Sequence, residues 1–548
     1  MAEIVDLERV ISNISGFDVE RELKRSQTIN RQQTAPVQEE GEASGLGGAD
    51  LEKGLSGRDR KDSSASGSTL HDAANQLEPA EENDPNIVFW DGPDDPENPM
   101  NWPQWRKNVA VGIVSGITFI TPLASSMFAP GVKDLMAEFH STNVELGSFV
   151  VSIFLLGFAV GPLFLAPASE LYGRSIIYNI SNICFVLCTI GCALAPSLNF
   201  LIGFRFLAGT FGAAPLTLGG GTISDVIPVE KRGVAMALFA MGPLMGPVVG
   251  PVAGGFLADA MGWRWVFWLL TICSGVVTVL TLIFLRETYA PKILGDRAAR
   301  LRKETGNPKL RSKLTSTLPP REVFSRALAR PFKMLFTSPL IFTMSLHMAI
   351  VYGYLYLLFT TFPTVFQGQY GFSTSTVGLS YLGIGIGSLL GLLVLGIVSD
   401  RILAHYTIRS GGVMKPEYRL PPMSYGAPLI PIGLFWYGWT AKFEVHWIVP
   451  IMGTALVGIG LLATFMPINT YIVDGYPKYA ASALAATTVL RSLFGALLPL
   501  AGPRMYDALG LGWGNSLLGF IALLFLPMPF VFQRYGERLR NKYSVGFE

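Results

Sequence analysis

Apolar residues gather in twelve segments of about 20 residues, separated by shorter polar connections. A helix needs about 20 apolar residues to cross the hydrocarbon core of a bilayer. Backbone groups in lipid must be paired within the segment, so we expect transmembrane α-helices. The predicted spans are residues 108–129, 144–168, 175–195, 199–224, 232–258, 264–286, 339–365, 375–399, 423–441, 446–472, 479–503 and 512–533.

Polar stretches flank and divide these spans. Residues 1–105 are rich in serine, glycine and charged residues and cannot bury a core, so we expect a disordered tail. The predicted organisation is this cytosolic tail (1–105), a six-helix bundle (106–286), a cytosolic central loop (287–338), a second six-helix bundle (339–533) and a C-terminal tail (534–548).

Lysine and arginine are unevenly distributed over the loops. Basic clusters occur in the central loop and at residues 231–232, 401–419 and 534–542, whereas the opposite loops carry isolated charges such as Lys133 and Lys442. Because basic loops stay in the cytosol, both termini are predicted to be cytosolic. We expect a multi-pass protein of the plasma membrane.

The two groups of six spans resemble each other. Asp225 and Asp474, which lie 249 residues apart, are each followed by a proline three positions later, and the same offset relates Gly209 to Gly458. Parallel repeats of this kind place a small-molecule site between the halves at mid-membrane. The predicted fold is therefore an all-α membrane protein with two pseudo-repeat bundles of six helices.

Composition excludes several classes of protein. The net charge is +2 and charged residues make up 15% of the chain, which does not favour a nucleic-acid partner. The four cysteines and five histidines are not spaced as a metal site or a disulfide framework. No nucleophile–base pair is evident, so an enzyme is not expected.

Residues 241–257 form an unusual apolar segment. Glycine recurs every fourth residue, and proline follows three of these glycines, so the glycines share one helical face. One interpretation is a small-residue packing seam. The other is a hinge helix where the bundles meet, with candidate residues Gly242, Gly246, Gly250, Pro251, Gly254 and Gly255.

The stretch from Gly246 to Gly255 resembles the fifth-span signature of major facilitator superfamily antiporters, which marks exporters in that family. Residues 98–102, 262–268 and 473–483 resemble its fungal twelve-span drug:proton antiporters. The resemblance covers residues 100 to 540. It implies alternating access between two bundles, driven by a proton gradient without a bound cofactor.

Two arginines lie within predicted spans, whereas no acidic residue lies near the middle of one. Charge at this depth is costly and functional by default. Arg205 begins an Arg-x-x-x-Gly motif that resembles the superfamily's fourth-span motif, which is associated with proton coupling; the alternative is an arginine bonded to helix carbonyls. Arg491 resembles the eleventh span of the fungal antiporters, and either lines the cavity or supports a helix. A cationic interior favours neutral or anionic compounds.

The loop after the second span resembles the superfamily's conformational latch. In it, Glu170 is expected to face the start of the eleventh span, and Arg174 to pair with Asp225. Ordinary charge at a membrane interface is the alternative. The second copy is predicted to use Asp400, Arg401 and Asp474.

Aromatic and polar residues on several spans are candidates for the cavity wall, although packing alone could explain any one of them. They are His347, Tyr352, Tyr356, Asn469, Met241, Met245 and Phe494. Together they suit flat, mostly apolar compounds.

The predicted function is proton-coupled efflux of neutral or anionic drugs, toxins or secondary metabolites. An uptake carrier for organic acids and a non-transporting membrane sensor remain alternatives. The expected partners are a small-molecule substrate and the lipid bilayer, and the chain is expected to act as a monomer.

Overall fold

The computed structural model describes residues 86–548, except residues 229–230, 315–318, 412 and 544–548. The chain divides into two units, Met1–Gly67 and Ser68–Glu548, and all described residues belong to the second. The predicted disordered tail falls largely on residues 1–85, outside the described residues.

The first half, which is the segment from α4 to α11, contains α4 (Gln104–Ser126), η2 (Ala129–Gly131), α5 (Val132–Glu138), α6 (Val144–Tyr172), α7 (Arg174–Ala193), α8 (Leu198–Gly212), α9 (Ala214–Val226), α10 (Arg232–Met261) and α11 (Arg264–Phe284). The second half, from α14 to α21, contains α14 (Pro339–Phe362), η4 (Pro363–Gln367), α15 (Thr374–Val377), η5 (Gly378–Tyr381), α16 (Leu382–Arg409), η6 (Pro416–Arg419), α17 (Pro421–Gly426), α18 (Leu429–Lys442), α19 (Ile448–Gly475), η7 (Pro477–Tyr479), α20 (Ala480–Phe525) and α21 (Met528–Tyr543). A connecting segment holds α12 (Ala290–Thr305), β2 (Arg311–Ser312) and α13 (Pro320–Thr337), and β1 (Ile87–Val88) and η1 (Pro99–Asn101) precede α4.

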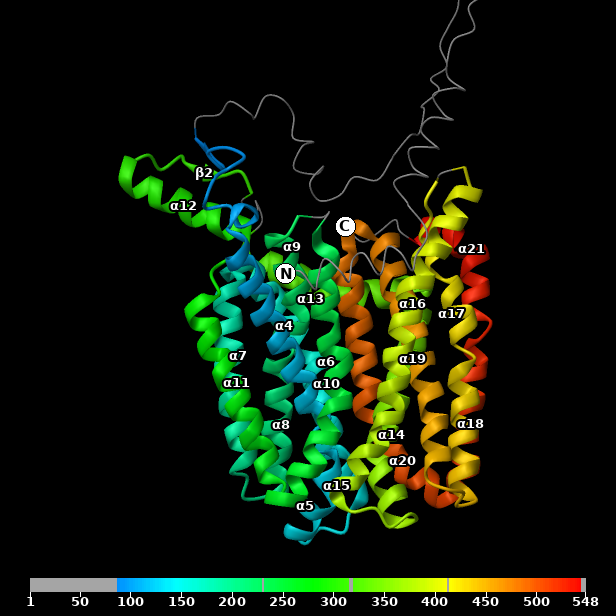
Figure 1. Cartoon of the computed structure of the whole chain (residues 1–548). Coiled ribbons are helices and arrows are strands. Elements are labelled where there is room, and N and C mark those ends of the chain that lie inside the picture. Colours follow the sequence, from blue (N-terminus) through cyan, green and yellow to red (C-terminus); the bar gives the residue numbers. More distant parts are fainter. Residues whose placement is uncertain (1–85, 229–230, 315–318, 412, 544–548) are drawn as a thin grey trace, which may run out of the picture. The chain divides into compact units, whose positions relative to one another are not determined.

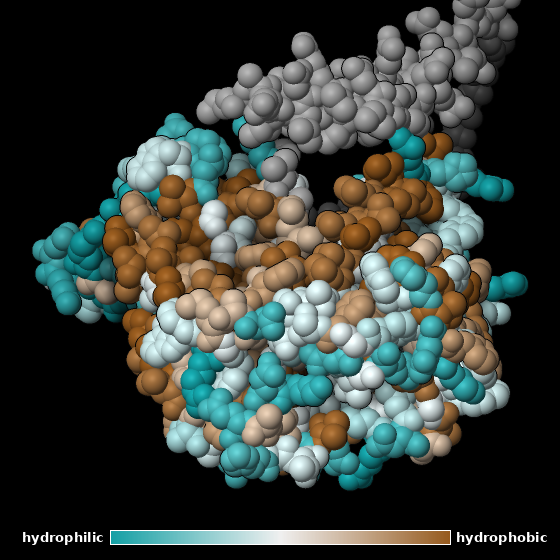
Figure 2. Space-filling view, turned by 60° about the horizontal axis from the view of Figure 1, so that its bottom comes forward, coloured by the Kyte–Doolittle hydropathy of each residue, from teal (hydrophilic) through white to brown (hydrophobic). Residues whose placement is uncertain are grey.

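Ten helical stretches of the described residues are long and apolar enough to cross a membrane. The long helices run side by side, with α9 and α13 at one end and α5 and α15 at the other, which we call the far end (Figure 1). Hydrophobic side chains cover the flank of the unit, while the end that comes forward in Figure 2 is mostly hydrophilic. This distribution is that of a protein whose flank faces lipid.

The count of ten differs from the predicted twelve at two places. The ninth predicted span corresponds to α17 and α18, and α18 has only 14 residues. The last two predicted spans fall within one continuous stretch, Ala480–Tyr543. Within that stretch Gly510 has φ 71° and ψ 170°, which lies outside any helical conformation and divides α20 into two helices.

The end of the predicted tail, residues 86–105, is ordered, contrary to expectation. β1 pairs in parallel with β2 of the connecting segment. Arg297 of α12 forms ion pairs with Asp91 and with the buried Asp95, at 2.7 Å from the latter. Burial alone would raise the pKa of Asp95, but hydrogen bonds from the Asp91 and Glu97 amides and from Arg297 outweigh it and lower that pKa. Residues just before α4 are therefore fastened to the connecting segment by an ionised carboxylate.

The glycine face of α10 packs against α4 of the same half. A Cβ atom at Gly246 would lie 2.8 Å from the Leu123 amide nitrogen, and backbone atoms of α4 are equally close at Gly242 and Gly250. α10 is continuous although it contains three prolines. The Pro247 carbonyl, which Pro251 leaves without its helical donor, accepts a hydrogen bond from the Ser126 hydroxyl instead. Gly254 packs on Met127, the residue that follows α4, so the packing-seam interpretation fits all four glycines.

The adjoining residues face the second half instead. A Cβ atom at Gly255 would lie 2.8 Å from the Thr374 carbonyl oxygen, and one at Gly378 would lie 2.6 Å from that of Pro251. α10 is therefore packed tightly on α4 along one face and meets the second half along another. Its role as a hinge remains a prediction.

We predict that Gly246→Val destabilises the protein by about 1–3 kcal/mol, because the side chain would collide with the backbone of α4. The measurement is the thermal unfolding midpoint of the purified protein. Gly275→Val in α11 is the matched control, since a Cβ atom at Gly275 has open space around it. Equal midpoints for the two variants would contradict the seam.

Candidate functional site

An arginine and three aromatic rings form a cluster inside the second half. The guanidinium carbon of Arg491 lies 5.2 Å from the ring centre of Tyr352 and 5.6 Å from that of Phe465. The Tyr352 ring lies 5.1 Å from that of Tyr356. Arg491 Nε is buried without a hydrogen-bond partner among the described residues. A half-buried cation on aromatic faces, with an unused donor, is suited to bind a flat anion.

The cluster lies at the seam between the halves. Gly495, one turn from Arg491 on α20, is packed between Tyr352 and Leu155 of α6. The Tyr356 hydroxyl lies 2.7 Å from the hydroxyl of Ser125 on α4, and both residues are fully buried. A molecule in contact with Arg491 would therefore lie beside both halves.

Arg205 occupies a different environment. It is 1% exposed and is enclosed by the aromatic rings of Phe128, Phe154 and Phe267. All three of its nitrogens donate to helix carbonyls, at 2.6–3.5 Å: those of Ala124, Ser125, Val150 and Val151. Arg205 thus cross-links α4, α6 and α8, and it holds the backbone of the serine that bonds Tyr356.

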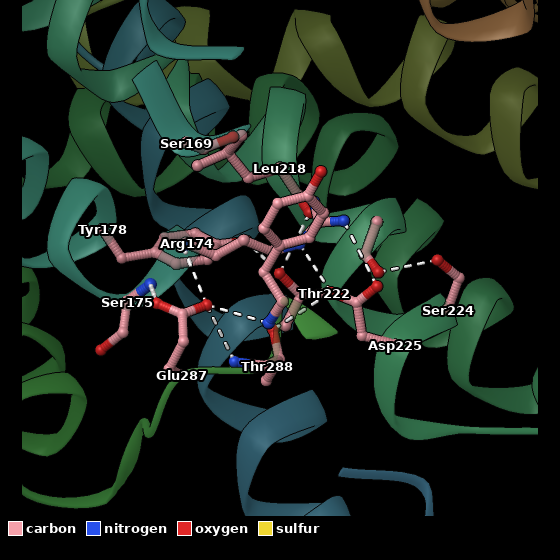
Figure 3. Close-up of polar contacts among 12 residues, drawn as sticks. Ser169, Arg174, Ser175, Tyr178, Leu218, Thr222, Ser224, Asp225, Glu287 and Thr288 are labelled. Atoms are coloured by element: carbon pink, nitrogen blue, oxygen red, sulfur yellow. Dashed lines mark hydrogen bonds and ion pairs between the residues drawn. The ribbon is translucent and has the colours of Figure 1, made fainter. Parts of the chain in front are cut away.

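The end of α6, the start of α7 and the end of α9 meet in a polar network (Figure 3). Arg174 Nε lies 2.6 Å from Asp225 Oδ2, and Thr288 donates to the same oxygen. The predicted pairing of Arg174 with Asp225 is present in this geometry. Its role as a conformational latch remains a prediction.

Sequence reasoning missed Glu287 in this network. Its carboxylate accepts hydrogen bonds from the amides of Arg174 and Ser175, at 3.0 and 3.1 Å, and so caps the start of α7. Gly173 has φ 99°, and a Cβ atom there would collide with the Glu287 carboxylate. Glycine is needed at this position for both reasons. The position of Glu287, an acidic residue directly after the predicted sixth span, was the feature of the sequence that could have identified it.

The second half has an equivalent network with a different cation. Arg419 pairs with Asp400 and Asp474, each at 3.0 Å. Arg401, the predicted cation, is exposed on α16. Arg174 begins α7, the third membrane-spanning stretch of the first half. Arg419 ends η6, one residue before α17, which opens the corresponding region of the second half. A comparison of corresponding helices in the two halves would have identified Arg419, whereas a fixed residue offset does not.

Glu170 is exposed at the end of α6. Among the described residues no hydrogen bond or ion pair reaches its carboxylate, although the charges of Arg174 and Arg330 act on it. Arg330 of α13 lies over the ring of Tyr479, which directly precedes α20. The predicted contact of Glu170 with the start of the eleventh span is not found among the described hydrogen bonds and ion pairs, and its role in a latch remains a prediction.

We predict that Asp225→Asn lowers stability by about 1.5–3 kcal/mol, because a charged hydrogen bond in a partly buried site is lost. The thermal unfolding midpoint measures this loss. Asp296→Asn is the matched control, since Asp296 forms an exposed i,i+4 pair with Lys292. An unchanged midpoint for Asp225→Asn would argue against a tight network.

The other cavity candidates are dispersed. His347 is buried beside Phe525, and its Nδ1 has no partner among the described residues. Met241 is 45% exposed. No hydrogen bond or ring contact within the described part of the chain joins the Arg491 cluster to His347, Asn469, Met241, Met245 or Phe494. Phe465, which does join it, was not predicted.

Polar contacts between the halves, where the structure describes both partners, lie at mid-depth or toward the far end. Arg504 of α20 forms an ion pair with Glu145 at the start of α6, with Nη2 3.0 Å from Oε2. The Thr374 hydroxyl lies 3.5 Å from the carboxylate of Asp134. These two contacts join the halves at the far end, and the contact between Ser125 and Tyr356 joins them at mid-depth.

A profile described as the Major Facilitator Superfamily matches residues 114–499. The chain belongs to the major facilitator superfamily. It is 56% identical to the MFS-type transporter penM of Penicillium rubens over 466 residues. The aligned part covers 85% of this chain and 92% of that protein. It is 50% identical to the efflux pump radE of Floropilus chiversii, over 88% of this chain and 90% of that one.

Solved structures agree in fold. The xylose transporter XylE of E. coli, described as a partially occluded inward open conformation, matches with a TM-score of 0.59 and 17% identity, over 78% of this chain and 98% of that one. The family predicted from the sequence is confirmed, within the fungal efflux transporters. This member of the superfamily is a multi-pass membrane transporter and not an enzyme.

Proposed function

We propose that this transporter exports small, mostly apolar compounds that are neutral or anionic, including secondary metabolites, by proton-coupled alternating access. The observation that carries the proposal is Arg491, a cation at the seam between the halves with an unused donor and two aromatic faces. A relative named as an efflux pump supports the outward direction.

The proposal includes the arrangement in the membrane. The chain crosses the plasma membrane twelve times, with α17 and α18 forming one crossing and the break at Gly510 separating the last two. Both termini are cytosolic, and a monomer is sufficient. In this arrangement the far-end contacts of Arg504 with Glu145 and of Thr374 with Asp134 form a closed outer gate. Export requires these contacts to break.

Inside-out plasma-membrane vesicles under an imposed pH gradient test the proposal. The panel contains an aromatic polyketide, an aromatic carboxylic acid, an uncharged azole and a polyamine. We expect gradient-dependent uptake of a neutral or acidic compound but not of the polyamine, because no acidic residue lies near the middle of a predicted span to receive a polycation.

Vesicles lacking the transporter provide the baseline, and dissipation of the gradient tests the coupling. Transport of the polyamine alone would overturn the anionic specificity. Accumulation of the acid by intact cells instead of vesicles would show an uptake carrier. Absence of all transport by correctly inserted protein would contradict the exporter.

A further inference from the structure

A cavity of about 310 Å³ lies at the far end, and Arg491 is not among its lining residues. The first half contributes α5 and the start of α6, including Val132, Met136 and Ser148. The second half contributes the end of α14 and η4, including Thr360 and Gln367. The volume is that of a site for a small organic molecule.

The lining indicates the chemistry of a ligand. Most of the wall is apolar, with the hydroxyls of serines and threonines at several points. Lys133 is the cation in this lining. Two nearby carboxylates are paired with arginines, Glu145 with Arg504 and Glu138 with Arg264, and that of Asp134, next to Lys133, lies 3.5 Å from the Thr374 hydroxyl. The Oε1 atom of Gln367 is buried and lacks a donor among the described residues. A compact apolar acid with a hydroxyl or amine donor complements these groups.

The cavity is bounded by the contacts that join the halves. Thr360 donates to the Tyr356 carbonyl, so the cavity lies one helical turn from the bond between Tyr356 and Ser125. Val144, next to the gate residue Glu145, lines it. η4 is a π-helical turn, a departure from α-helical geometry that is frequent at functional sites.

We propose that this cavity binds a compact, mostly apolar organic acid from the far side and that its occupation holds the outer gate closed. The second clause rests on the proposed function, because it requires the halves to part there during export. Since both halves contribute walls, the site exists only while they are together. A ligand at ten times its dissociation constant would raise the ratio of closed to open protein about elevenfold.

Binding of 8-anilinonaphthalene-1-sulfonate, an aromatic anion that fluoresces in apolar sites, tests the first clause. The full-length protein is held in nanodiscs of zwitterionic lipid, and fluorescence from empty nanodiscs is subtracted. We expect a saturable binding component that Thr364→Trp abolishes, because the indole fills the cavity. Lys133→Gln should weaken the affinity five- to tenfold.

Lys442→Gln is the matched control, because Lys442 is also a far-end cation but lies over the Trp439 ring, outside the cavity lining. Its affinity for the probe should equal that of the unmodified protein. Absence of saturable binding would overturn the proposal, and so would equal binding by the unmodified protein and Thr364→Trp.

A cross-linked gate tests the second clause. In a protein whose four cysteines are replaced by serine, Glu145→Cys and Arg504→Cys are joined by a short bifunctional thiol reagent. The probe should bind the cross-linked protein at least as tightly as the uncross-linked one. Weaker binding would overturn the assignment to the closed state. Neither assay needs a gradient or a transported compound, so failure of export in vesicles would leave both results interpretable.

Discussion

Arg491→Gln is expected to lower the export of an aromatic carboxylic acid by about 10- to 100-fold, the equivalent of one charged hydrogen bond. The Arg491 guanidinium is the cation of the Arg491 cluster between the halves, and its Nε has no hydrogen-bond partner among the described residues. The substitution should leave the thermal unfolding midpoint nearly unchanged, because no described hydrogen bond is lost. Initial uptake rates in inside-out vesicles measure the effect.

Two comparisons sharpen this prediction. Arg491→Lys keeps the charge but loses the planar fork and its stacking on the rings, so an intermediate rate is expected. An uncharged azole should lose less than the acid in both variants, since it lacks the charge that Arg491 would meet. Equal losses for acid and azole would show that Arg491 supports the helices instead of binding the anion.

Arg205→Ala is expected to destabilise the folded protein by about 3–5 kcal/mol. The change opens a large cavity among three aromatic rings and removes the donors that join α4, α6 and α8. The measurements are the yield of monodisperse protein and its thermal unfolding midpoint. Arg286→Ala is the matched control, since Arg286 is exposed at the end of the first half. A midpoint equal to that of this control would contradict the cross-linking role.

Arg205→Lys separates architecture from proton coupling. A single ammonium cannot reach carbonyls on two helices as a guanidinium does, so a structural role predicts a lower midpoint. The ratio of transport with and without the gradient should then stay as in the unmodified protein. A coupling role predicts a normal midpoint with transport that no longer responds to the gradient.

The two arginines show how far a sequence pattern reaches. Both were singled out because charge is costly in the hydrocarbon core, and that reasoning applies equally to each. Their partners distinguish them: Arg205 is enclosed by carbonyls that the sequence cannot place, whereas Arg491 meets rings from two other helices. Arg205 has the carbonyl partners of the second alternative, whereas the role of Arg491 as part of a cavity wall remains a prediction.

The networks around Arg174 and Arg419 likewise show that the sequence identifies charged residues but not always their partners. The pairing of Arg174 and Asp225 follows from their places at the ends of neighbouring helices, which the repeat made visible. In the second half Asp474 keeps an arginine partner, but Arg419 supplies it from a loop of different length. A fixed offset fails there because loops can lengthen without changing which helix ends meet.

The sequence by itself determined the membrane class, most of the spans, the family and the small-residue face of α10. These properties are local or periodic, and the lipid solvent permits few alternatives to apolar helices of one length. Only the tertiary structure decided what each special residue contacts: α4 for the glycines, carbonyls for Arg205, Phe465 for Arg491, and the ordered segment before α4 for Arg297. Such contacts join residues far apart in the chain, and their formation depends on how the helices pack.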